Sequence, residues 1–95
     1  MRSTYLVTYD ISSPRRLQKV YKCMCGFGSH IQFSVFLCDL TPKDKIRMVK
    51  QLADLIEKKQ DQVLLIHLGP ANEKTPNRID SIGRPYIPTG STYVV

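Results

Sequence analysis

Two segments of this sequence each place a hydroxyl residue directly before a proline, and each follows a run of strand-forming residues. Ser13-Pro14 comes after the aromatic and β-branched run Tyr5–Tyr9, and Thr41-Pro42 comes after a second apolar segment. Serine and threonine are favoured at helix N-caps, and proline is favoured at the first helical position. The predicted order is therefore strand, helix, strand, helix, which limits the chain to folds that pack helices on a sheet.

The segment at 30–40, HIQFSVFLCDL, alternates apolar and polar residues and predicts either one long strand or two short strands that meet at a bend. A further buried strand is predicted at 63–68. If 30–40 divides in two, the order becomes βαββαβ, the ferredoxin-like α+β sandwich, which is the predicted fold class. We expect one domain over residues 1–95. The predicted buried stripe of the second helix consists of Ile46, Val49, Leu52, Ala53 and Ile56.

The C-terminal residues 83–95 end in Thr92-Tyr93-Val94-Val95, which favour a strand. A terminal strand needs a sheet edge for its backbone hydrogen bonds. We expect that edge to belong either to the same chain or to a second copy.

The chain is basic, with 14 Lys and Arg against 8 Asp and Glu and a net charge of +6, which favours a polyanionic partner. Arg15, Arg16, Lys19 and Lys22 fall in the first predicted helix. They either solvate one helix face or follow a phosphate backbone. The sequence shows no targeting signal and no run of membrane-span length, so a cytoplasmic location without a membrane partner is expected. An odd set of three cysteines predicts reduced thiols.

Asp10 is the only acidic residue before Asp39, and it stands where the first predicted strand ends. It either caps the turn into the helix or binds a metal; Ser12 and Ser13 are already available as caps. Mg²⁺ is the natural metal for a carboxylate, with Mn²⁺ as the alternative. Because one carboxylate makes a poor site, a two-fold axis that brings together Asp10 from two copies is one solution.

Three short motifs carry a family resemblance over residues 4–68: Tyr9-Asp10-Ile11, the middle motif at 32–36 (QFSVF) and Leu40-Thr41. Together they resemble the CRISPR-associated protein two family, whose members partner the CRISPR integrase during spacer acquisition. The resemblance implies a ferredoxin-like homodimer in which the C-terminal strand pairs with the partner's sheet. It also implies a metal-dependent endonuclease on single-stranded RNA or double-stranded DNA, with Asp10 as the metal-binding acid.

Matched by position, the resemblance implies catalytic contributions from Tyr9, Ser34 and Phe36 beside Asp10, and a role in activity for the basic residues Arg15, Arg16 and Lys19. The chain departs from the family pattern at Ser12-Ser13-Pro14 and Leu37-Cys38, where relatives often carry acids. Three alternatives stay open. The first is a non-catalytic DNA-binding scaffold that bridges integrase dimers. The second is a toxin-type ribonuclease of the related virulence-associated family. The third, a small-molecule-binding regulatory domain, is disfavoured by the charge.

Overall fold

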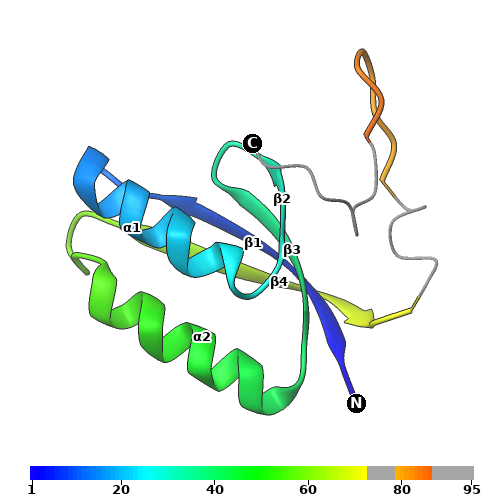
Figure 1. The fold of residues 1–95 in the computed structure, drawn as a ribbon, viewed down its shortest axis with the longest axis horizontal. Helices are drawn as coiled ribbons and strands as arrows, with labels where there is room; N and C mark the ends of the chain where they lie inside the picture. Colours follow the sequence, from blue (N-terminus) through cyan, green and yellow to red (C-terminus); the bar gives the residue numbers. More distant parts are fainter. Residues whose placement is uncertain (73–78, 87–95) are drawn as a thin grey trace.

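The computed structural model describes residues 1–72 and 79–86, which form a four-stranded antiparallel sheet with two helices on one of its faces (Figure 1). The elements follow the order β1 (Ser3–Asp10), α1 (Pro14–Cys25), β2 (Ser29–Gln32), β3 (Val35–Leu40), α2 (Pro42–Leu55) and β4 (Gln62–Pro70). The strand order across the sheet is β2-β3-β1-β4. This arrangement confirms the ferredoxin-like α+β fold.

Both predicted helix starts are capped by their own sequence signals. The Ser13 hydroxyl accepts the backbone N–H of Arg16, and the Thr41 hydroxyl accepts the backbone N–H of Asp44. A proline follows each cap at the start of its helix. These bonds satisfy backbone donors that no intrahelical acceptor reaches, so each strand gives way to a helix at a defined residue.

The segment at 30–40 divides into two strands at Phe33 and Ser34. Ser34 has a φ of 61°, in the left-handed region, which reverses the chain between β2 and β3. Its carbonyl accepts the backbone N–H of Tyr9 at 3.0 Å, so the turn is joined to the end of β1. The reversal removes Phe33 from the strands, and 79% of this residue is exposed.

The core lies between the sheet and the helices. Its buried apolar residues are Val7, Tyr9, Val20, Met24, Phe36, Cys38, Leu40, Met48 and Leu52. The predicted stripe of α2 was wrong at Ile46 and Val49, which are 68% and 43% exposed, and at Ala53, which is also exposed. Leu52 is buried as predicted, and Met48 is buried beside it. Apolar residues occupy more than one side of α2, and the adaptable methionine side chain fills the core in place of the β-branched residues.

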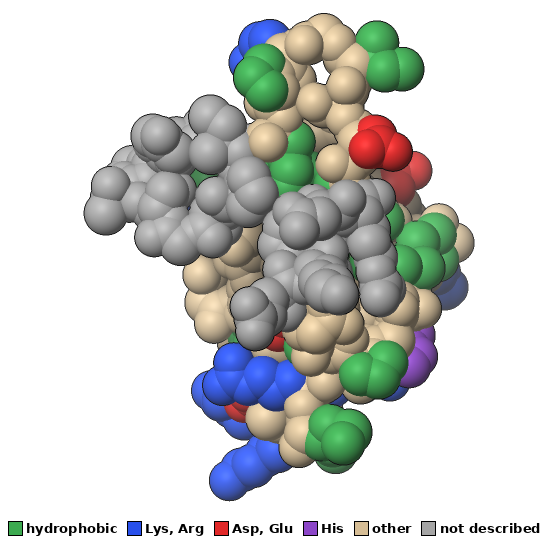
Figure 2. All heavy atoms as spheres, turned by 90° about the vertical axis from the view of Figure 1, so that its right-hand side faces the viewer, with side chains coloured by type: hydrophobic (Ala, Val, Ile, Leu, Met, Phe, Trp, Pro, Cys, Tyr) green, Lys and Arg blue, Asp and Glu red, His purple; other side chains and the backbone are tan. Residues whose placement is uncertain are grey.

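The opposite face of the sheet carries apolar side chains that neither α1 nor α2 covers. The predicted strand at 63–68 is present as part of β4, but the prediction that it is buried was wrong: Leu64, Ile66 and Leu68 are 47%, 43% and 41% exposed. The register pairs Leu6 of β1 with Ile66, so both side chains lie on this open face. Figure 2 shows hydrophobic side chains at the surface along its right-hand side and at its top and bottom, and the largest group of Lys and Arg at its lower left. A row of exposed apolar residues of this kind is typical of an interaction surface.

Two predictions from composition can be compared with the structure. Cys23, Cys25 and Cys38 are all free thiols, as predicted, and burial raises the pKa of Cys38 to about 12. Within residues 1–72 and 79–86, no helix is long and apolar enough to cross a membrane. The single domain over 1–95 stays a prediction, and the predicted strand at 92–95 lies outside the described residues.

Candidate functional site

Asp10 is the last residue of β1, and its side chain is exposed where the chain turns toward α1. The register places it opposite Gln62, the first residue of β4. Among the described residues, no ion pair engages its carboxylate, since the two salt bridges there join other groups. The Asp10 carboxylate at the end of β1 is therefore accessible to a ligand. Its role as a metal ligand stays a prediction.

The four predicted basic residues of α1 divide into two kinds. Arg15, Lys19 and Lys22 are exposed and lie three or four residues apart, so they form one stripe on the outer side of the helix. Arg16 differs, because its side chain is only 27% exposed and pairs with Asp61. We call Arg15, Lys19 and Lys22 the basic stripe; these side chains are available to phosphate groups.

Asp61, in the connection from α2 to β4, is a residue that the sequence did not single out. Its carboxylate accepts Nε of Arg16 at 2.8 Å and the backbone N–H groups of Glu57 at 2.8 Å and Ser12 at 3.0 Å. The Arg16 guanidinium holds the pKa of Asp61 well below its usual range, against the opposing effect of burial. An acid directly before a predicted strand was the available signal, but nothing in the sequence identifies its partner Arg16, 45 positions earlier.

The end of β1 contains Tyr9 and lies against Ser34 and Phe36. Phe36 is fully buried, and its ring stacks 6.2 Å from that of Tyr9 at an interplanar angle of 27°. Burial, followed by the nearby Cys25 and Tyr21, raises the pKa of Tyr9 to about 12, so its hydroxyl stays protonated at neutral pH. Ser34 acts through its carbonyl, as described above. Tyr9 and Phe36 therefore support the end of β1 by packing in the core, and the half-buried Ser34 supports it through one backbone hydrogen bond. Catalytic roles for these three residues stay predictions.

The residues present fit a divalent metal only in part. An exposed carboxylate is the hard oxygen ligand that Mg²⁺ and Mn²⁺ take. In the described part of the chain, no three His, Cys, Asp or Glu residues gather into a metal-binding group. Asp10 is thus a ligand of the right chemistry that needs further oxygen ligands beyond those that the described residues gather around it.

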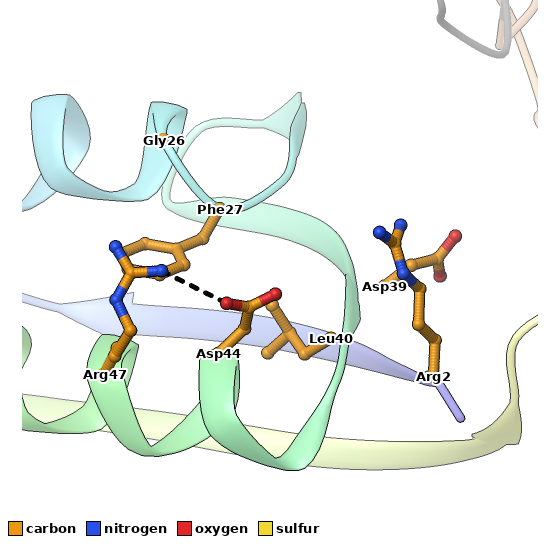
Figure 3. A pocket seen from close by; sticks show the side chains of 7 residues that line it. All are labelled: Arg2, Gly26, Phe27, Asp39, Leu40, Asp44 and Arg47. Atoms are coloured by element: carbon orange, nitrogen blue, oxygen red, sulfur yellow. Dashed lines mark hydrogen bonds and ion pairs between the residues drawn. The ribbon is translucent and has the colours of Figure 1, made fainter.

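A hollow of about 260 Å³ lies at the end of β1 that is opposite to Asp10 and is shown in Figure 3. Since β1 is eight residues long, this hollow is roughly 25 Å from Asp10. Three of its four charged side chains have partners within the protein: Arg47 pairs with Asp44 at 3.1 Å and lies over the ring of Phe27, and Asp39 accepts the Thr4 hydroxyl at 2.6 Å. This hollow is separate from the candidate site.

The fold and the open carboxylate beside a basic helix define a small ferredoxin-like protein with a polar site at one end of its sheet. The family model described as CRISPR associated protein Cas2 matches residues 3–75. The chain belongs to the Cas2 family.

The relatives agree with this assignment. The chain is 40% identical over 82 residues to "CRISPR-associated endoribonuclease Cas2 1" of Rhodospirillum rubrum, covering 86% of this chain and 79% of the relative. It is 40% identical over 91 residues to "CRISPR-associated endoribonuclease Cas2" of Geobacter sulfurreducens, covering 93% and 92%.

Solved structures share the fold. Streptococcus pyogenes Cas2 superimposes with a TM-score of 0.72 at 28% identity, covering 84% of this chain and 99% of the other. A hypothetical protein from Thermus thermophilus has a TM-score of 0.78 at 22% identity, covering 94% and 100%, and supports the fold alone.

Proposed function

We propose that this protein is a homodimeric, metal-dependent endonuclease of CRISPR adaptation, with Mg²⁺, or alternatively Mn²⁺, held by Asp10 of both copies. Its substrate is single-stranded RNA or double-stranded DNA, and its protein partner is the CRISPR integrase. The observation that carries the proposal is the exposed Asp10 carboxylate, without an ion pair among the described residues, next to the basic stripe of α1. The relatives from Rhodospirillum rubrum and Geobacter sulfurreducens are both named endoribonucleases.

The division of roles follows from the chemistry of the side chains. The basic stripe binds backbone phosphates, which makes binding dependent on salt. A bound Mg²⁺ supplies polarisation of a phosphodiester and activation of water. The protonated Tyr9 and buried Phe36 keep the end of β1 in place, so the carboxylate is presented in one position.

The homodimer is supported by the open face of the sheet. An apolar row along β4 is a poor surface to leave in water for so small a chain, and a second copy would cover it. The same association would bring a second Asp10 carboxylate to the site, where residues 1–72 and 79–86 of one chain gather no further metal ligands.

The substitution Ile66→Lys tests the homodimer, because it places a charge on the open face of the sheet. Val49 on α2 is the matched control, because it is equally exposed, at 43%, but lies outside this face. Sedimentation should show a dimer for wild type and Val49→Lys and a monomer for Ile66→Lys. A dimer in both variants would place the interface elsewhere.

The scaffold alternative keeps a specific observation in its favour. The family that the sequence resembles often carries acids after the Asp-Ile pair, whereas this chain has Ser12 and Ser13. The backbone N–H of Ser12 donates to Asp61. A scaffold would bind duplex DNA through the basic stripe without cleaving it. Membership of a CRISPR family argues against the toxin-type alternative.

The first test of the proposal is cleavage of labelled RNA and duplex DNA with Mg²⁺, Mn²⁺ or a chelator. The proposal predicts cleavage of at least one substrate, abolished by the chelator. Tight, salt-sensitive DNA binding with no cleavage under any metal would favour the scaffold instead.

A further inference from the structure

The buried ion pair of Arg16 and Asp61 lies directly beside the segment that follows Asp10. We infer that Arg16 is a positioning residue: with Asp61 it holds the loop after β1 so that the Asp10 carboxylate keeps its place, and it does not bind nucleic acid. This inference rests on the proposed function of Asp10. It separates Arg16 from the basic stripe, with which sequence and resemblance had grouped it.

The geometry of the pair is that of a two-point contact. Arg16 donates Nε to Oδ2 of Asp61 at 2.8 Å and Nη2 to Oδ1 at 3.2 Å. The Asp61 side chain is fully buried, with an exposure of 0%. The same Nη2 also reaches Oγ of Ser12 at 3.1 Å and Oε1 of Gln60 at 3.2 Å. Three of the five guanidinium N–H groups, those on Nε and Nη2, are thus directed at acceptors inside the protein, so a bidentate contact with a phosphate would have to displace at least one of these bonds.

Besides Arg16 of α1, the partners of Asp61 come from two connections, one that follows Asp10 and one that precedes Gln62, the residue opposite Asp10 in the sheet. Ser12, two residues after Asp10, donates its backbone N–H and its hydroxyl to Oδ1 of Asp61 at 3.0 and 3.1 Å. Glu57, in the connection from α2 to β4, donates its backbone N–H to Oδ2 at 2.8 Å. Asp61 also precedes Gln62, the residue that pairs with Asp10 across the sheet. One carboxylate therefore ties together the chain after Asp10 and the strand beside it.

The planar guanidinium fork is what this arrangement requires. A lysine at position 16 keeps the charge but presents a single nitrogen, so it cannot reproduce the contact of Nε and Nη2 with the two oxygens of Asp61. If Arg16 served only as a positive charge for phosphate, lysine would replace it. The substitution Arg16→Lys thus distinguishes the two roles without a change of net charge.

The test compares Arg16→Lys with Arg47→Lys in the RNA and DNA cleavage assay. Thermal unfolding first shows that both variants are folded. Arg47 is the matched control, because it also pairs with an aspartate but lies at the other end of β1. We expect Arg16→Lys to lower kcat about 10–100-fold with KM within about twofold, since small misplacements of a reacting group have effects of this size. Arg47→Lys should match wild type. Cleavage by Arg16→Lys within about twofold of wild type would overturn the inference.

Two readouts are independent of catalysis. The amide of Ser12 should exchange its hydrogen faster in Arg16→Lys and in Asp61→Asn than in wild type, because the loop loses its anchor. In binding to labelled DNA, Arg15→Ala should reduce the dependence of log K on log salt by about one, while Arg16→Ala leaves it unchanged. Unchanged exchange at Ser12, or a reduced salt dependence in Arg16→Ala, contradicts the inference.

These readouts also separate the two possible failures. If the wild-type protein cleaves nothing, the proposed function fails, and hydrogen exchange and salt dependence still decide whether Arg16 positions the loop. If wild type cleaves and Arg16→Lys cleaves equally well, the proposed function stands and the positioning role fails.

Discussion

Replacing Phe36 by alanine separates a packing role from a catalytic one at a residue for which the resemblance implies activity. Phe36 is fully buried, and the rings of Tyr9, Tyr21 and His30 lie 6.2, 5.8 and 5.0 Å from it. The substitution would leave a cavity among three aromatic rings, and the sheet and α1 cannot both close over it.

The expected cost can be worked from this burial. A buried phenylalanine removes about 150–250 Å² from water, which at about 25 cal/mol per Å² corresponds to roughly 4–6 kcal/mol as an upper limit. Phenylalanine-to-alanine changes in cores cost about 3–5 kcal/mol. A loss of about 4 kcal/mol lowers the melting temperature of a domain of this size by roughly 16–32 °C.

The assay is thermal unfolding at one protein concentration, since association changes the apparent stability. Phe33→Ala is the control: Phe33 is 79% exposed, and a surface change should stay within about 0.5 kcal/mol. A Phe36→Ala protein with an unchanged melting temperature and no cleavage would refute the packing role and indicate direct participation in catalysis.

Two further predictions concern the supports of the site. Gly28→Ala should cost about 1–3 kcal/mol or more, because a Cβ there would stand 2.5 Å from the Leu37 carbonyl and collide with Cys38 Sγ. Gly26→Ala, where the nearest atom is 3.4 Å away, should cost less in the same urea titration. Asp61 should contribute stability above its unfolded pKa of about 3.9, a contribution lost as pH falls through its lowered folded pKa. The difference in unfolding free energy between wild type and Asp61→Asn should therefore narrow below about pH 4, and a constant difference would argue against the ion pair.

The helix starts could be predicted from the sequence because their causes are local. The Ser13 and Thr41 hydroxyls bond to amides three residues away, so a short window contains the whole interaction. The place of Asp10 at the end of a strand could be predicted for a related reason, because the strand before it and the capping residues after it are contiguous in sequence.

The parts that could not be predicted depend on distant contacts or on backbone geometry. Alternation at 30–40 does not reveal a turn, because the φ of Ser34 is a property of the backbone and not of the apolar pattern. The buried side of α2 was misassigned because periodicity alone cannot choose between two apolar sides. Arg16 looked like a member of the basic stripe, and only the fold shows Asp61 beside it.

The central claim is that Asp10 holds the metal of a nuclease, and the most direct measurement compares wild type with Asp10→Asn. Both proteins are first shown to be folded dimers, and labelled RNA and duplex DNA are then incubated with Mg²⁺, Mn²⁺ or a chelator. We predict metal-dependent cleavage by wild type and none by Asp10→Asn, with nucleic-acid binding retained in both. Metal-dependent cleavage that survives in Asp10→Asn would contradict the claim.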